Sequence, residues 1–178
     1  DMQAGVNVPE QYPEEPLEYF APLVQMFGTT DHEHFISRHQ EMAFTPGSHT
    51  EYRSIDTQLL GMAVVKITGR RLSDLFSEWY WKPLGAEHDA IWIVDQIGGT
   101  EKAFSGFACA ARDLARVGVL LANEGMVGKK RLVSEAWVNR LATPVALESY
   151  DWGYAAQIWH PRQGVQLGLG TLGQHMYI

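Results

Sequence analysis

The sequence predicts an α+β fold in which a largely helical segment is followed by the strands of an antiparallel sheet. Helical patterns of apolar residues occupy the middle of the chain, over 55–68, 72–81 and 110–123. The stretch after Trp152 has no helical period, is rich in aromatic residues and is interrupted by glycines, as strands and turns are. Because helices come first and strands last, the order favours α+β over alternating βαβ units.

The first fifty residues are rich in Pro, Gly, Glu and His, which predicts loops with one or two short helices. One helix is expected over Leu17–Phe27, with Gly28 suited to end it. The clearest helix is Ile55–Thr68, whose apolar residues are too many for one narrow stripe and predict burial on most sides. Ser54 is expected to cap its start and Gly69 its end. A β-branched run at 64–67 leaves a strand as the competing prediction.

Local signals define the remaining elements. A second helix is expected over Leu72–Trp81, and Pro83 ends it. A third covers Ala110–Asn123, with apolar residues at spacings of three and four, and Ser134 caps a short fourth helix. Strands are expected at Tyr154–Trp159 and Gln174–Ile178.

Composition excludes several functions. The chain has 178 residues, of which 14 are Lys or Arg and 21 are Asp or Glu, for a net charge of −7. An acidic chain without a basic cluster is a poor ligand for the phosphate backbone of nucleic acid. The longest uncharged apolar run, Leu59–Val65, is too short to span a bilayer. Cys109 is the single cysteine, so an intrachain disulfide is excluded.

Both ends of the sequence are patterned like the interior of a longer protein. Asp1 opens a loop with several prolines and no signal-peptide pattern, and Gln174–Ile178 resembles a strand that needs a neighbour. We therefore expect residues 1–178 to be a single partial domain. Within it, 1–150 would be mainly helical and 151–178 would supply sheet strands.

The sequence contains no complete catalytic signature of the common kinds. Gly-x-Ser-x-Gly, a P-loop, His-Glu-x-x-His and an EF-hand loop are all absent. Gly168–Gly173 has the glycine spacing of a dinucleotide loop, but a strand rather than a helix follows it, so we set it aside.

Histidines and carboxylates gather near the start of the chain. His32, His34 and His39, with Asp31 and Glu33 among them, are ligand types that zinc and copper accept. Their spacing matches no standard site, and a solvated acidic loop is the simpler interpretation. The sequence therefore predicts no metal and no cofactor, with a metal-binding module as a minor alternative.

Tyr52 stands directly ahead of the helix predicted at Ile55–Thr68. The positive end of a helix dipole favours a phenolate, and a neighbouring lysine ammonium would favour it further. A tyrosine in such a setting is able to accept a proton. The alternative is a half-buried tyrosine whose hydroxyl bonds to backbone, and these residues alone favour that alternative.

A series of short motifs then runs through nearly the whole chain in a fixed order. They are Phe44-x-Pro46-Gly47-x4-Tyr52-x-Ser54, Leu60-Gly61, Thr68-Gly69, Trp81-x-Pro83-Leu84-Gly85, Phe104-Ser105-Gly106-Phe107, Ala111-Arg112-Asp113-Leu114-Ala115-Arg116-Val117-Gly118, Asn123-Glu124-Gly125, Val133-x3-Trp137-Val138, Trp152-Gly153-Tyr154 and Gly170-x2-Gly173-Gln174. By their order and spacing the chain resembles the serine β-lactamase-like hydrolases. These include class C β-lactamases, penicillin-binding-protein-like esterases and 6-aminohexanoate-dimer hydrolases, and the last motif is most similar to the aminohexanoate-hydrolase and esterase branch.

The resemblance implies a β-lactamase/transpeptidase-like fold and acyl transfer through a serine ester. The family's nucleophile lies in Ser-x-x-Lys at a helix start, and the lysine and the motif tyrosine pass the serine proton to the leaving group. By resemblance, Tyr52 is that tyrosine. Ser54 stands where the family's Tyr-x-Asn motif has asparagine, as a shorter substrate-binding side chain.

The resemblance also implies where the oxyanion hole lies. The family's Lys-Thr-Gly or His-x-Gly motif corresponds here to Gly168-Leu169-Gly170, which has no cation. Thr171, next to Gly170, would supply one backbone N–H of the hole, and the nucleophilic serine the other. The missing cation fits an esterase or an amidase for uncharged or linear substrates better than a penicillinase.

No serine of the chain has lysine three residues later. The resemblance therefore predicts that the nucleophile precedes these residues in a longer parent, and that this segment alone is inactive. The expected function is a serine hydrolase for small esters or amides, with no cofactor, nucleic-acid or membrane partner. The alternatives are a non-catalytic binding relative and the module of His32, His34 and His39. The sequence indicates neither the compartment nor the oligomeric state.

Overall fold

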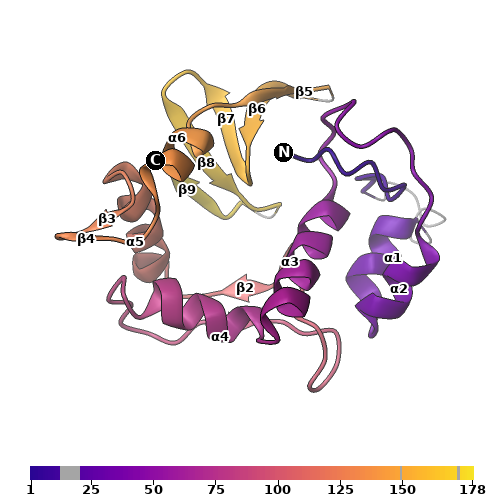
Figure 1. Cartoon of the computed structure of the whole chain (residues 1–178), viewed down its shortest axis with the longest axis horizontal. Coiled ribbons are helices and arrows are strands. Elements are labelled where there is room, and N and C mark those ends of the chain that lie inside the picture. The colour runs from indigo at the N-terminus through magenta and orange to yellow at the C-terminus, as the bar shows by residue number, and fades with distance from the viewer. Residues whose placement is uncertain (13–20, 149, 172) are drawn as a thin grey trace. The chain divides into compact units, whose positions relative to one another are not determined.

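A computed structural model describes residues 1–12, 21–148, 150–171 and 173–178. Its chain divides into two compact units (Figure 1). The helical unit contains Met2–Ser73 and Trp92–Phe107, and the sheet unit contains Asp1, Asp74–Ile91 and Ala108–Ile178. Among the described residues, no helix combines the length and the apolarity that crossing a membrane requires. The expectation of a single partial domain stays a prediction.

Two short helices precede the main helix of the helical unit. Helix α1 (Pro22–Gly28) has proline at its first position, where a missing N–H costs nothing. Helix α2 (His32–Arg38) is capped by Asp31, whose carboxylate accepts a hydrogen bond from the His34 N–H at 2.8 Å. The prediction of short helices in this region is thus confirmed. The first part of the helix expected at Leu17–Phe27 lies outside the described residues.

The core of the helical unit joins these helices to the main one. Its buried side chains are Val8, Leu23, Met26, Phe35 and Ile55. They come from the N-terminal segment, α1, α2 and α3, so apolar burial ties all four together.

Helix α3 (Ser54–Thr68) confirms the predicted helix, and the competing strand is wrong. Gly69 ends it in the left-handed conformation, with φ 66°. The predicted cap is wrong, because Ser54 is the first helical residue rather than the residue before it. Its N–H and its hydroxyl both donate to the Glu10 carboxylate, at 2.7 and 2.8 Å. A carboxylate from a distant segment thus satisfies the start of the helix.

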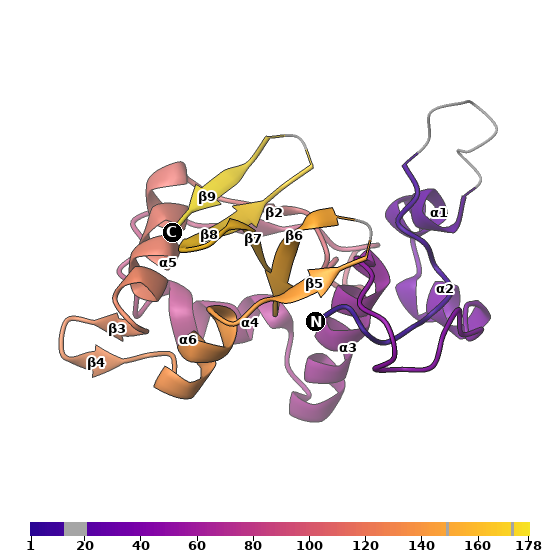
Figure 2. The ribbon, with the colours of Figure 1, turned by 90° about the horizontal axis from the view of Figure 1, so that it is seen from above.

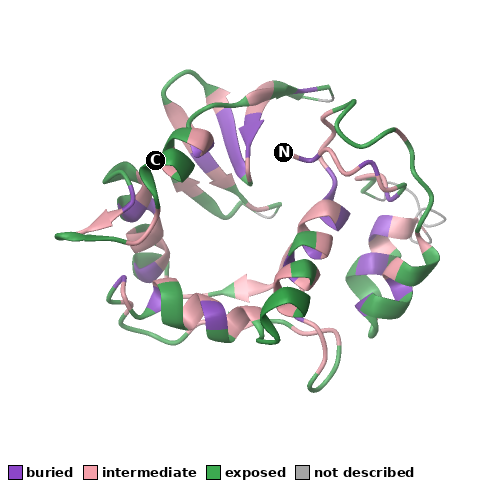
Figure 3. Ribbon diagram, in the orientation of Figure 1, coloured by how far each residue is buried: buried purple, intermediate pink, exposed green. Residues whose placement is uncertain are grey.

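Burial of α3 on most sides is also wrong (Figure 3). The buried residues of the helix are Ser54, Ile55, Gln58 and Gly61. Leu60 and Ile67 are 59% and 83% exposed. The number of apolar residues in a helix sets its hydrophobicity, whereas the elements that lie against it determine which faces are covered.

Gly61 is the point where α3 packs against the segment around Ala103. A Cβ atom at Gly61 would lie 2.3 Å from the Ala103 Cβ and 3.0 Å from the Leu72 Cδ1. Gln58, one turn earlier, fixes the same segment: its Nε2 donates to the Glu101 carbonyl at 3.1 Å, and its Oε1 accepts from the Ala103 N–H at 2.8 Å. The close approach therefore has little freedom to relax.

We expect Gly61→Ala to lower the free energy of unfolding by about 1–3 kcal/mol, because the added methyl overpacks this contact. The loss would outweigh the gain of about 1 kcal/mol in helix propensity. Gly28→Ala is the matched control, since nothing lies within 4 Å of its added Cβ. Urea denaturation measures both variants. Equal stability of Gly61→Ala and the parent would show that the segment moves away at no cost.

The helices of the sheet unit match their predictions closely. Helix α4 (Leu72–Phe76) begins at the border of the units and continues as the π-helical turn η2 (Ser77–Trp81), within the bounds predicted for one helix. Helix α5 (Ala111–Ala122) and helix α6 (Glu135–Leu141) follow. Ser134 caps α6 as predicted, with its hydroxyl oxygen accepting from the Trp137 N–H at 3.2 Å. The π-helical geometry has no local signal in the sequence.

The strands of the main sheet are antiparallel and follow one another in order (Figure 2). They are β5 (Val145–Leu147), β6 (Tyr150–Ala155), β7 (Ile158–Arg162), β8 (Val165–Leu169) and β9 (His175–Tyr177). Two smaller two-stranded sheets pair β1 (Ile91–Trp92) with β2 (Phe107–Ala108) and β3 (Met126–Val127) with β4 (Lys130–Arg131). Helices followed by an antiparallel sheet confirm the α+β prediction.

One strand prediction is wrong. The segment Tyr154–Trp159 is a hairpin rather than one strand, because the chain turns at Ala156 and Gln157, with φ of 43° and 80°. A turn with two positive φ angles normally carries glycine or asparagine, and neither is present to announce it. The strand predicted at Gln174–Ile178 is confirmed by β9.

Aromatic rings hold β6 against β7. Tyr150, Trp152 and Tyr154 alternate along β6 and meet the ring of Trp159 edge-on, with centroids 5.0, 6.1 and 5.0 Å away. The His160 Nε2 lies 2.9 Å from the Leu141 carbonyl, which ties β7 to the end of α6. Strand β8 pairs with β7, and β9 pairs with β8, so both are attached to this anchored part of the sheet.

Candidate functional site

The helical unit places Tyr52 half-buried at the entrance to α3. Its neighbour Arg53 is 4% exposed and bonds in two directions, from Nη1 to the Val6 carbonyl and from Nη2 to the Glu51 carboxylate, both at 2.9 Å. The guanidinium also lies 5.3 Å from the centroid of the Phe44 ring. The backbone on both sides of the tyrosine is therefore anchored.

The N-terminal segment runs beside this loop. The Glu51 N–H donates to the Met2 carbonyl at 3.1 Å, and the Ala4 N–H donates to the Asp56 Oδ2 at 3.0 Å. Gly5 has φ 78°, and a Cβ there would lie 2.5 Å from the Phe44 carbonyl oxygen, so glycine is required for this approach. These contacts hold the loop before α3 from a second side.

Asp56 lies four positions after Tyr52, in the first turn of α3. Burial raises the pKa of this carboxyl, opposed by the hydrogen bond from Ala4 and the charge of Arg53. Its second oxygen, Oδ1, is buried and has no hydrogen-bond partner among the described residues. No signal in the sequence marks this acid, because only the fold shows that it is buried.

Ser54, predicted to contact substrate, is 6% exposed and directs its hydroxyl to Glu10 in this structure. The two residues predicted for the oxyanion hole lie in the sheet unit, between β8 and β9. The Gly170 N–H donates to the Gln174 carbonyl at 2.7 Å, whereas Thr171 is exposed at the turn. A Cβ at Gly170 would lie 2.5 Å from the Gln174 Oε1, the end of a flexible and exposed side chain. The assigned roles of these residues stay predictions.

The three histidines of the metal-binding alternative differ in burial and in hydrogen bonding. His32 is fully buried, its two ring nitrogens have no hydrogen-bond partner among the described residues, and burial lowers its pKa, which favours the neutral ring. His34 is exposed, and the His39 Nδ1 lies 2.8 Å from the Phe35 carbonyl. In the described ranges, no three His, Cys, Asp or Glu side chains are grouped to hold a metal ion. The metal-binding alternative therefore lacks a set of ligands there.

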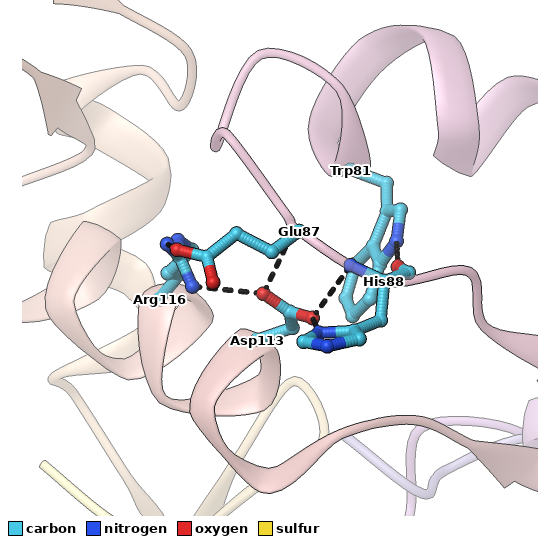
Figure 4. A network of polar contacts seen from close by, with 5 residues as sticks. All are labelled: Trp81, Glu87, His88, Asp113 and Arg116. Carbon is cyan, nitrogen blue, oxygen red and sulfur yellow. Dashed lines mark hydrogen bonds and ion pairs between the residues drawn. The ribbon is translucent and has the colours of Figure 1, made fainter.

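A buried carboxylate in the sheet unit organises a polar network (Figure 4). Asp113, on α5, is 0% exposed and accepts hydrogen bonds from the N–H groups of Glu87 and His88, at 2.9 and 3.0 Å. It also accepts from the His88 Nδ1 at 2.9 Å and from the Arg116 Nη1 at 2.8 Å. The Trp81 indole N–H donates to the His88 carbonyl at 2.9 Å, which extends the network to η2.

These contacts hold the pKa of Asp113 below its ordinary value, first through the Glu87 N–H and then through His88 and Arg116, against the opposing effect of burial. Arg112 is exposed, and Arg116 pairs with Asp113 because residues three apart share a helix face.

The comparisons with known proteins agree with this architecture. A family model described as Beta-lactamase matches residues 31–177. The chain belongs to this family. The resemblance inferred from the motifs is thereby confirmed, together with the β-lactamase/transpeptidase-like fold and the assignment to a family of hydrolases.

Three proteins illustrate the relationship. The curated 6-aminohexanoate-dimer hydrolase of Paenarthrobacter ureafaciens is 31% identical over 140 aligned positions, and the match covers 72% of this chain and 36% of that protein. A solved structure described as "Putative 6-aminohexanoate-dimer hydrolase from Bacillus anthracis" has a TM-score of 0.82 and 26% identity, over 99% of this chain and 50% of that one. A penicillin-binding protein from Bacillus halodurans shares the fold, with a TM-score of 0.64 and 18% identity over 99% of this chain and 62% of that one. This β-lactamase-family chain thus spans about a third of the curated relative's length.

Proposed function

We propose that this chain supplies the proton-transfer tyrosine and the oxyanion-hole strand of a serine hydrolase that cleaves small esters or amides through an acyl-enzyme. The observation that carries the proposal is the position of Tyr52, which stands in the family motif at the anchored entrance to α3. A general base must be held within hydrogen-bond reach of its proton, and the contacts of Arg53 and Asp56 restrict the loop that carries it.

In the proposed reaction, Tyr52 and the family's lysine receive the proton of the nucleophilic serine as its oxygen attacks the substrate carbonyl. The N–H of Thr171 and the serine's own N–H stabilise the oxyanion of the tetrahedral intermediate. Collapse of the intermediate breaks the bond to the leaving group, which takes up the proton. Water then attacks the serine ester, with the same base accepting a proton, and the acid product leaves.

Linear amides and simple esters are the proposed substrate class. A relative that is 31% identical to this chain is named for the dimer of 6-aminohexanoate, an amino acid whose dimer is joined through an amide bond. The triplet Gly168-Leu169-Gly170 has no cation where a Lys-Thr-Gly motif would have one. A site without that cation gains less from a substrate carboxylate, and this favours uncharged substrates.

The nucleophile belongs to the remainder of the proposed enzyme, because no serine of this chain has lysine three residues later. The test compares the 178-residue chain with a full-length protein that contains it. We expect the full-length protein to hydrolyse p-nitrophenyl acetate and a linear amide, with a burst of acyl-enzyme, and the 178-residue chain to do neither.

Turnover by the 178-residue chain would contradict the placement of the nucleophile. Absence of turnover and of acyl-enzyme in the folded full-length protein would instead favour a non-catalytic binding relative.

A further inference from the structure

The helical unit has a surface hollow of about 610 Å³ between the end of α1 and helix α2. This volume lies in the range of pockets for small molecules. Its lining includes Gln25, Thr29, His34, Phe35, Arg38 and His39. We propose that this hollow binds a short-chain carboxylate, with the carboxylate at Arg38 and the chain against the Phe35–His39 ring pair. Tyr52, Ser54, Gly170 and Thr171 do not line it.

Charge is the first support for an anionic ligand. Arg38 and His34 are four positions apart on α2 and therefore share a face of the helix, and His39 follows directly. In the described part of the chain, Arg38 has no hydrogen bond or ion pair, and no acidic side chain lines the hollow. An arginine that has no counter-ion among the described residues is suited to take one from solution.

The shape of the lining explains why a carboxylate with an apolar chain fits. The Phe35 ring is 6% exposed and stacks on the His39 ring at a centroid distance of 4.1 Å. The Phe35 carbonyl accepts the proton of the His39 Nδ1 at 2.8 Å, which fixes the orientation of that imidazole. Phe35 and His39 line the hollow together with Arg38. The planar Arg38 fork matches the two oxygens of a carboxylate.

The Thr29 hydroxyl is already engaged, since it bonds to both the backbone N–H and the carbonyl of Asp31 at 3.1 Å. It therefore shapes the rim and is not assigned to the ligand. Recognition rests on Arg38, with His34 as a second polar contact.

To test the proposal, hexanoate is titrated into the 178-residue chain at constant ionic strength, and the imidazole C–H resonances are followed by NMR. We expect saturable shifts of His34 and His39 with a Kd of about 1 mM, and no shift of His175, an exposed histidine of the sheet unit. Acetate, which has the carboxylate without the chain, should bind about tenfold more weakly. Inorganic phosphate should also bind more weakly than hexanoate.

Arg38→Gln should raise the Kd for hexanoate about tenfold or more, because the charge-assisted contact is lost. Arg112→Gln is the matched control, an exposed arginine on α5 that should leave the Kd unchanged. His34→Gln should weaken binding by a smaller factor, and circular dichroism checks that each variant is folded. The proposal is overturned if the shifts do not saturate, if folded Arg38→Gln binds like the parent, or if acetate or phosphate binds as tightly as hexanoate.

Discussion

Tyr52→Phe is expected to lower kcat/KM for ester hydrolysis by the full-length protein by about 10²–10⁴-fold, the range that a positioned acid–base group contributes. The substitution removes one hydroxyl and keeps the ring. The half-buried position at the entrance to α3 is therefore preserved, together with the anchoring contacts of Arg53. Loss of proton transfer should reduce kcat, whereas substrate binding, and hence KM, should change little.

Tyr80→Phe is the matched control for this loss. Tyr80 is also half-buried, and its ring lies 5.9 Å from that of Phe76 on the neighbouring turn. Removal of its hydroxyl should leave kcat/KM within about twofold of the parent, as expected for a change outside the reacting groups. Equal turnover by the parent and by Tyr52→Phe would refute the assigned role, and the hydrolase would then need another base.

Asp113→Asn is expected to lower the Tm by about 10 °C, the largest effect on stability that the structure suggests. The carboxylate accepts four hydrogen bonds from Glu87, His88 and Arg116. An amide of the same shape presents N–H to groups that also donate, and it leaves the Arg116 guanidinium without its buried counter-charge. Asp151→Asn, an exposed acid on β6, should shift the Tm by no more than about 2 °C.

The effect of Asp113 should depend on pH in a defined direction. The folded-state pKa is lowered, so the unfolded state binds the proton more readily. The stabilisation is then present above the ordinary pKa of an aspartate and is lost as the pH falls through the lower, folded-state value. Thermal scans between about pH 7 and pH 3 should show the gap between parent and Asp113→Asn narrowing toward acid. A constant gap would mean that the carboxylate's charge is not what stabilises the network.

Local sequence signals located most helices, but they did not determine which other segments contact them. The left-handed Gly69 and the Ser134 cap are short-range features, since a turn or a cap involves a few neighbouring residues. The start of α3 differs, because the group that satisfies Ser54 is Glu10, which is distant in the chain. The turn at Ala156 and Gln157 is local, but it has none of the glycine or asparagine that normally marks a turn with positive φ angles. The sequence therefore did not predict it.

The candidate site shows the same division. The motif around Tyr52 was proposed from its spacing in the sequence, and the role of Tyr52 stays a prediction. Nothing local distinguishes Asp56 or Asp113 from exposed acids. Their altered pKa values arise from N–H donors of remote segments and from burial, which are properties of the folded chain.

The sequence by itself determined the order of helices and strands, the absence of a Ser-x-x-Lys motif and the membership of a hydrolase family. Only the tertiary structure decided which apolar faces are covered, which carboxylates are buried and which cations, such as Arg38, have no partner within the described ranges. Backbone conformation follows largely from neighbouring residues, whereas burial and charge pairing depend on segments that meet only after folding.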